Sequence, residues 1–253
     1  TAGIAWMPVS TSALGGGNSS SLTIRMVYDS TGKYVEAIGC RGNVEFAFVS
    51  GDRVLMNFTF QGRLNVWSDA ASGNTAPVAD TMEIPPAFVG VNLGIQESSY
   101  AATTGGEVTS TIFNSMTVSM ANELVVRESV SAASGYDVAY ITGRNPSMTF
   151  NPDAVSESTY AFWDRFLSGE LTRASMTVGD TTGNQFLFKM PALQFTGIAD
   201  GNRDEVFVYD STTTCTGGDY GSSIQQGAES AAEASTQTNA RLGTNNEIAL
   251  IAI

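Results

Sequence analysis

The stretch GCRGNVEFAFVSGDRVLMNFTFQG, residues 39–62, decides the fold, because it reads as two β-strands joined by a tight turn. Apolar and polar residues alternate on both sides of VSGDR, which is the pattern of an antiparallel pair with one buried face. Phe46 and Phe48 share one face of the first strand, and Phe58 and Phe60 share one face of the second. We therefore predict a β-hairpin that these phenylalanines anchor to its own core.

Glycines stand at both ends of this hairpin, in its turn and early in its first strand. Glycine adopts turn and bulge conformations that other residues disfavour. We predict that the corners of the hairpin are set by Gly39, Gly42, Gly51 and Gly62.

The row opposite the phenylalanines is small, polar or acidic and includes Glu45, Asn57 and Thr59. In an antiparallel sheet with one packed face, the other face meets water. We predict that this row faces solvent or a water-filled space.

Composition favours a large, strand-rich protein. The chain has 253 residues, 42% of them hydrophobic, which suffices for the core of one large β domain or two small ones. Glycine is frequent, at 26 residues, and charged residues make up only 15%, whereas long helices need more Glu, Lys, Arg and Leu. No run of about 18 consecutive apolar residues is present, so we expect no membrane insertion.

The charge balance is acidic, with 12 Lys and Arg against 25 Asp and Glu and a formal net charge of −13. Proteins that bind nucleic acid tightly use clustered Lys and Arg to displace counterions from the phosphates. Because this chain is strongly acidic, we expect no tight binding of nucleic acid. The composition leaves two interpretations of the acidity open: solubility, or a surface that must not retain a polyanion.

Groups suited to catalysis or metal binding are sparse. The chain has no histidine, which removes the commonest general base and a common zinc ligand. Cys40 and Cys215 form no metal-spacing motif and are either buried thiols or a disulfide. Asp200, Asn202 and Asp204 have the alternate spacing of a calcium loop but lack its glycine and final glutamate, which favours an ordinary turn. We predict no enzyme activity, no cofactor and no metal.

The chain divides into strand-rich units and segments rich in Ser, Thr, Ala and Gly. We predict a first β unit over 1–67, an extended linker over 68–111, a second β unit over 112–210 and a C-terminal arm over 211–253. AIGCRGNVEFAF in the first unit resembles YITGRNPSMTFN in the second, which favours two related units, although independent halves remain an alternative. The predicted fold class is mainly β: an antiparallel sandwich or barrel with long extended loops.

One helix is predicted, over SESTYAFWDRFLSG (156–169), with Ser156 as its cap and Gly169 at its end. The chain ends in the apolar segment EIALIAI. Such a strand must pair, either closing its own sheet or adding to that of a neighbour. The candidate inter-subunit or inter-ring strand consists of Glu247, Ile248, Leu250, Ile251 and Ile253.

Two runs of the sequence carry a family resemblance. The first follows an apolar start, a loop, a strand and a turn, and its matching positions are Gly39, Arg41, Gly42, Asn43, Gly51, Asp52, Phe58, Phe60 and Gly62. The second comprises ITGRNPSMTFNPDA, a short helix and GDTTGNQFLFKMPALQFTGIADGNRDEVFVYD. In this pattern, over residues 4–67 and 112–210, the chain resembles the tail tube (major tail) proteins of long-tailed bacteriophages.

The resemblance implies a structural virion protein, assembled in the host cytoplasm, that stacks as rings into the hollow tail tube through which DNA is ejected. In that family each tube domain is a β-sandwich with a flanking helix, and its inner sheet joins those of its neighbours around the channel. Two such domains in one chain imply a trimeric ring, which the internal resemblance between the two units supports, and a hexamer of single domains is the alternative. The implied partners are further copies of the chain, tape measure, terminator and distal tail proteins, and DNA that passes without sequence readout. Glu45, Asn57 and Thr59 are then lumen-facing, on an acidic wall that repels phosphates.

Two other classes also fit a strand-rich acidic chain: a carbohydrate-binding adhesin sandwich and a capsid decoration or cement protein. An adhesin should expose aromatic residues on one sheet face or loop, whereas Trp6, Trp67 and Trp163 are scattered along the sequence. A cement protein would share the composition, and only the opening hairpin distinguishes it.

Overall fold

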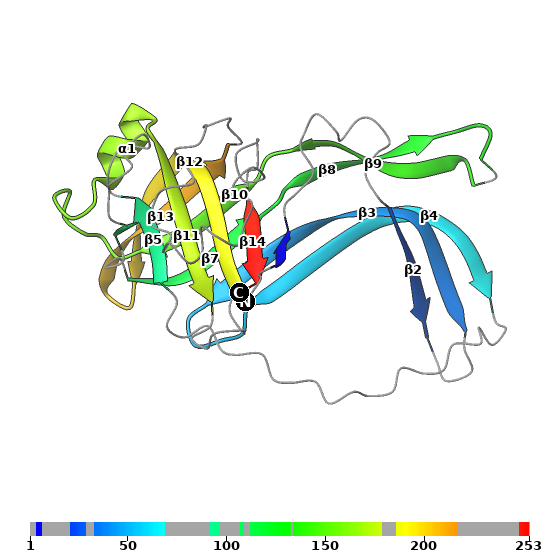
Figure 1. Cartoon of the computed structure of the whole chain (residues 1–253), viewed down its shortest axis with the longest axis horizontal. Helices are drawn as coiled ribbons and strands as arrows, with labels where there is room; N and C mark the ends of the chain where they lie inside the picture. The colour runs from blue at the N-terminus through cyan, green and yellow to red at the C-terminus, as the bar shows by residue number, and fades with distance from the viewer. Residues whose placement is uncertain are drawn as a thin grey trace.

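The computed structural model describes residues 4–6, 21–28, 33–68, 92–96, 107–108, 112–132, 134–178, 186–216 and 248–252. Within these ranges the regular structure is antiparallel strand apart from one short helix (Figure 1). The predicted fold class, mainly β with an antiparallel sandwich and a flanking helix, is confirmed. The elements are β1 (Ile4–Trp6), β2 (Leu22–Val27), β3 (Tyr34–Val49), β4 (Leu55–Ser68), β5 (Asn92–Gln96), β6 (Glu107–Val108), β7 (Phe113–Ser119), β8 (Asn122–Glu128), β9 (Tyr136–Arg144), β10 (Ser147–Pro152), α1 (Phe162–Ser168), β11 (Leu171–Val178), β12 (Phe186–Arg203), β13 (Val206–Cys215) and β14 (Ala249–Ala252).

The predicted hairpin is the pair β3 and β4, whose antiparallel register runs without a break from Arg41 opposite Gln61 to Ala47 opposite Leu55. Val44 lies opposite Phe58, and Phe46 lies opposite Met56. The side chains that the alternation placed on one face of the hairpin therefore do share that face. The turn between the strands contains Gly51 at φ +76°, a conformation that favours glycine.

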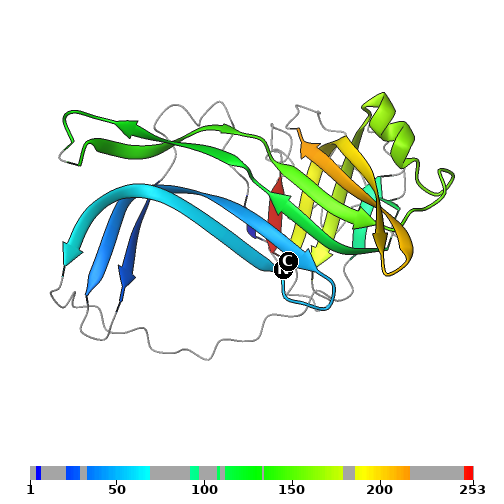
Figure 2. The ribbon, with the colours of Figure 1, turned by 180° about the vertical axis from the view of Figure 1, so that it is seen from behind.

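A 12-stranded sheet folds over on itself to make the sandwich. Its path runs β2-β3-β7-β10-β13-β12-β11-β5-β6, with β4 beside β3, and with β14 joining β12 to β1. The fold-over occurs along the long strand β12, because residues 193–203 pair with β13 whereas residues 186–194 pair with β11. One strand therefore belongs to both layers, which face each other in Figures 1 and 2.

The core lies between these layers. Phe46 and Phe48 of β3 contact the ring of Phe188 on β12 at centroid distances of 4.7 and 5.4 Å, both edge to face. Such aromatic pairs add about 0.5–1.5 kcal/mol beyond the burial of their area. The rest of the core cluster is rich in methionine and valine, including Met116, Val118, Met148, Met176 and Met190.

Beyond the sandwich, β3 and β4 continue into a long curved arm, flanked on one edge by β2 (Figures 1 and 2). The hairpin of β8 and β9 packs against the same part of β3 and β4. Bulges between Glu36 and Arg41 interrupt the β3–β4 register in this arm, and Gly39 lies within one of them at φ +63°. A bulge bends the strand and increases its twist, which accounts for the curvature.

The helix is shorter than predicted. It begins at Phe162 with Ala161 as N-cap, and no side chain caps it. Ser156 instead forms a separate turn, in which its carbonyl oxygen accepts the amides of Thr159 and Tyr160. The predicted end is confirmed, because Gly169 adopts the left-handed conformation of a C-cap.

Both proposed β units contribute to the same sheet, since β3 pairs directly with β7. The division into two related units stays a prediction, and β13 continues to Cys215, past the expected boundary at residue 210. Within the expected linker, β5 and β6 are strands that pair with β11 and with each other. The rest of the linker and residues 217–247 lie outside the described residues.

Several smaller predictions are settled by the described residues. Asp200 and Asn202 lie in β12, and Asp204 lies in the tight turn between β12 and β13, where the Asn202 side chain accepts the amide of Glu205 at 3.1 Å. Cys40 and Cys215 are buried and not disulfide-bonded. No helix in the described ranges is long and apolar enough to cross a membrane.

Candidate functional site

A polar surface covers the outer side of β7, β10 and β13, directly behind the core. Residues 115–119 of β7, 147–152 of β10 and 210–215 of β13 alternate, with Met116, Val118, Met148 and Phe150 buried and their neighbours in the same strand exposed or half-buried. We call the outward-facing set the hydroxyl face: Ser115, Thr117, Ser119, Ser147, Thr149, Asn151, Asp210, Thr212 and Thr214.

Strand register places these side chains in rows. Thr117 lies opposite Thr149, and Thr149 lies opposite Thr212, so one row of threonines crosses three strands. Ser119 and Ser147 begin a second row. Because neighbouring strands lie about 4.8 Å apart, adjacent hydroxyls in a row are within reach of a shared water molecule.

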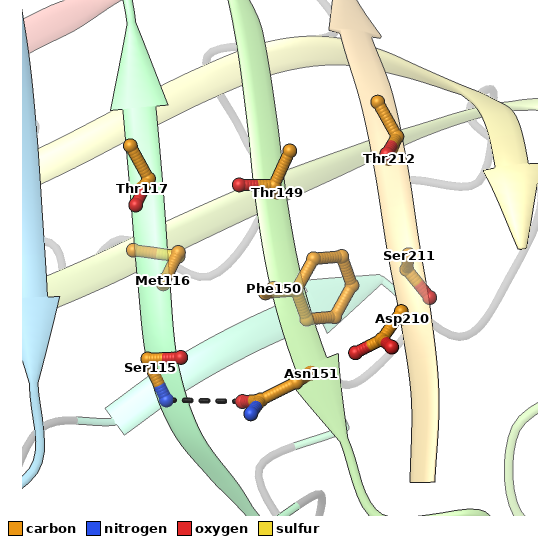
Figure 3. A pocket seen from close by; sticks show the side chains of 9 residues that line it. All are labelled: Ser115, Met116, Thr117, Thr149, Phe150, Asn151, Asp210, Ser211 and Thr212. Atoms are coloured by element: carbon orange, nitrogen blue, oxygen red, sulfur yellow. Dashed lines mark hydrogen bonds between the residues drawn. The ribbon is translucent and has the colours of Figure 1, made fainter. Parts of the chain in front are cut away.

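A shallow depression of about 200 Å³ lies within the hydroxyl face, and Figure 3 shows that its lining comes from three neighbouring strands. Asn151 is fixed at its rim, because its side-chain oxygen accepts the backbone amides of Asn114 and Ser115 at 3.1 and 3.0 Å. In the buried layer beneath, Thr213 donates to the carbonyl oxygen of Met148 at 3.0 Å. The lining offers hydroxyl, amide and carboxylate groups but no nucleophile–base pair.

No cluster of three or more His, Cys, Asp or Glu suited to a metal ion occurs in the described part of the chain. Asp210 is the sole ionisable member of the hydroxyl face. This surface can therefore hold water and form neutral hydrogen bonds, and it has little charge of either sign.

The predicted water-facing residues lie on the same side of the sheet as the hydroxyl face. Glu45 pairs with Ser119 on one side and with Asn57 on the other, and Thr59 pairs with Asn43. Glu45, Asn57 and Thr59 are exposed. They extend the polar surface from β7 across β3 to β4, and their assignment to a lumen stays a prediction.

The opposite side of β3 and β4 corrects part of the core prediction. Phe46 and Phe48 are buried as expected, at 8% and 0% exposure. Phe58 and Phe60 are not core residues in this chain, because they remain 57% and 41% exposed. The two strands differ because Phe188 of β12 packs on the phenylalanines of β3, whereas Phe58 and Phe60 of the neighbouring strand β4 remain exposed.

The predicted glycine corners have different structural roles. At Gly42 a Cβ would overlap the ring of Phe60, and at Gly62 it would overlap the thiol of Cys40. Gly51 is in the turn and touches nothing, and Gly39 packs under Val138. Close approach thus explains Gly39, Gly42 and Gly62, and turn geometry explains Gly51.

The C-terminal strand is engaged within the chain. β14 pairs with β12 on one edge and with β1 on the other, so that Leu250 lies opposite Phe188 and Trp6. Ile248 is buried in the core, and Ile251 lies opposite Leu187 and Ala5. Glu247 and Ile253 lie outside the described residues, and a role between subunits stays a prediction.

The sequence predicts the edge of the polar surface, at Glu45, Asn57 and Thr59, but not its centre on β7, β10 and β13. The signal was present in β7, where Thr117 and Ser119 alternate with methionine and valine. Register across β10 and β13, which only the fold provides, turns such separate alternations into one surface.

Comparison with known proteins assigns no function to this surface. No family model matches the chain. No curated protein matches it either.

Proposed function

We propose that this chain is a tail-tube-type assembly protein whose copies form rings that stack into a hollow tube for DNA. The observation that carries the proposal is the continuous polar surface from β13 to β4, which the apolar core backs across β13, β10, β7 and β3. This is the construction that a channel wall requires: one side packed within the subunit and the other wetted along its length.

The chemistry of the hydroxyl face suits passage rather than retention of DNA. Retention requires Lys or Arg to neutralise phosphates, and the hydroxyl face contains neither. Asp210 and Glu45 add repulsion that acts within a Debye length of about 8 Å at physiological salt. Relative to the acidic wall that the resemblance implies, the hydroxyl face is closer to neutral, so bound water contributes more and charge repulsion less.

The open edge of the sheet supports assembly. Among the described strands, β4 is paired along one edge only, with β3. An unpaired edge invites association with other chains, and closure into a ring satisfies it. A head-to-tail arrangement that closes would continue the polar surface from one subunit to the next.

One core cluster occupies the described part of the chain. A single sandwich per chain supports the hexameric ring over the trimeric ring that two domains would build. Further copies of the chain are thus the principal partners, and tape measure, terminator and distal tail proteins would meet the ends of the tube in the virion.

Electron microscopy of the purified chain tests the proposal. Stacked rings with an axial channel are expected. Discrete particles that bind glycans would assign the chain to the adhesins instead, and isolated trimers that bind only to a capsid shell would assign it to cement proteins.

A further inference from the structure

Large apolar side chains gather on the side of the arm that faces away from the β8–β9 hairpin. Met56, Phe58 and Phe60 alternate along β4 and are 55%, 57% and 41% exposed. Leu64 and Trp67 continue the same side at 57% and 70% exposure. We call these residues, together with Met26 of β2, the apolar arm face.

Register shows that these residues share one surface. Met26 lies opposite Val35, which lies opposite Trp67, so one row crosses β2, β3 and β4. Nearer the sandwich, Phe58 and Met56 lie opposite Val44 and the buried Phe46. The apolar arm face is therefore a lateral extension of the core surface, onto parts of β2 and β4 whose apolar side chains are exposed.

The other side of the arm is polar and already satisfied. Arg25 forms an ion pair with Glu36 at 2.6 Å, and Asn65 donates to the same carboxylate at 2.6 Å. Nearer the sandwich, buried Arg41 donates to the carbonyl oxygen of Ala139 and lies over the ring of Tyr140. The exposed apolar side is thus a specific feature of the arm, not a general property of both its surfaces.

The aromatic part of the surface is already ordered. The rings of Phe58 and Phe60 are nearly parallel, at an interplanar angle of 7° and a centroid distance of 5.8 Å. Gly42 offers no side chain beneath Phe60, so this ring lies directly on the backbone of β3. Rings held in place lose little conformational freedom when a partner covers them.

Size and chemistry indicate what covers this surface. The exposed side chains of the apolar arm face amount to on the order of 700 Å², close to the ~800 Å² that each partner contributes to a standard protein interface. The defining side chains include no ionisable group, and only Trp67 carries a hydrogen-bond donor, so they provide little for a sugar or a nucleic acid.

We propose that the apolar arm face docks onto a second copy of this chain. Two chains that each carry a net charge of −13 repel each other, and contact through a surface without ionised groups avoids bringing those charges together. This inference rests on the self-assembly in the proposed function, and it assigns the contact to the arm rather than to the sandwich.

The test compares the self-association of the full chain with that of two variants, by light scattering over a concentration series. Phe58→Ser/Trp67→Ser should weaken association at least tenfold while leaving the circular dichroism spectrum and thermal unfolding of the monomer unchanged. The control is Leu167→Ser, which removes an apolar side chain of still greater exposure (77%) from α1 and should associate like the wild type. Phe58→Leu keeps the surface apolar and should retain association. If this variant also loses association, the loss reflects a folding defect at position 58 and not the removal of an apolar contact.

Oxidative footprinting gives a second readout, because assembly should protect Met26 and Met56. Association of the double variant at wild-type strength would overturn the inference. So would a wild-type chain that stays monomeric at every concentration, or glycan binding that the double variant loses. Hollow tubes that form equally well with the double variant would leave the proposed function intact and reject the arm contact. Association through the arm into particles without a channel would support the arm contact and reject the proposed function.

Discussion

Gly39 of β3 lies so close to Val138 of β9 that a Cβ at position 39 would overlap the valine side chain. The same glycine has φ +63°, in the left-handed region, and lies within a β-bulge. This contact brings the β8–β9 hairpin onto the arm at the place where the arm bends.

Gly39→Ala should therefore destabilise the fold for two separate reasons. The left-handed backbone and the overlap with Val138 should together cost at least about 3 kcal/mol in the free energy of unfolding. Gly51→Ala is the matched control, because Gly51 has φ +76° and no neighbour within 4 Å, so it should cost only about 1 kcal/mol. Urea unfolding measures both, and equal losses would show that the contact with Val138 contributes nothing.

Phenylalanines on the same side of the hairpin should differ sharply in their effect on stability. Phe48→Ala empties a fully buried site and should cost about 3–5 kcal/mol. Phe58→Ala removes an exposed ring and should cost less than about 1 kcal/mol when measured at concentrations where the chain is monomeric. Comparable losses for the two variants would mean that β4 is covered within the monomer.

If the proposed function is right, a cation in the middle of the hydroxyl face should make the tube retain DNA. Thr149 is exposed between Thr117 and Thr212, so Thr149→Lys needs no repacking of the core. Assembled tubes of this variant should retain DNA in a salt-dependent manner and release it on the order of tenfold more slowly at low salt. Leu167→Lys on α1 controls for the added charge and should not retain DNA.

Glu45→Lys tests the edge of the same surface. It should also slow the passage of DNA and leave tube assembly intact, because Glu45 is exposed on β3. Electron microscopy and DNA-release kinetics measure the two effects separately. Loss of assembly with this single change would place Glu45 at a subunit contact instead.

Stability at alkaline pH should depend on Tyr160. Its side chain is buried against Phe162, and this burial penalises the phenolate and raises the pKa of Tyr160. A raised pKa in the folded state stabilises the fold below the unfolded-state value of about 10, and this contribution is lost as the pH rises through the folded-state pKa. Tyr160→Phe should remove that loss. The measurement is urea unfolding from about pH 8 to about pH 11, and identical pH dependence in both proteins would contradict the assignment.

How far the sequence predicts the structure is clearest in the opening hairpin. Alternation and the turn glycine predict β3, β4 and Gly51, because these features depend on residues near in sequence. The burial of Phe46 and Phe48 follows from the same pattern. The exposure of Phe58 and Phe60 does not follow, since it depends on whether a distant strand covers β4.

The candidate site divides in the same way. The sequence by itself determined a strand-rich antiparallel fold, the end of the helix at Gly169 and a polar side on each strand, because backbone preference and period-two alternation are local. Only the tertiary structure decided that Thr117, Thr149 and Thr212 form one row, and that an apolar arm extends beyond the core. Those features depend on pairing between segments far apart in the chain, and on which faces the sandwich covers, neither of which local alternation specifies.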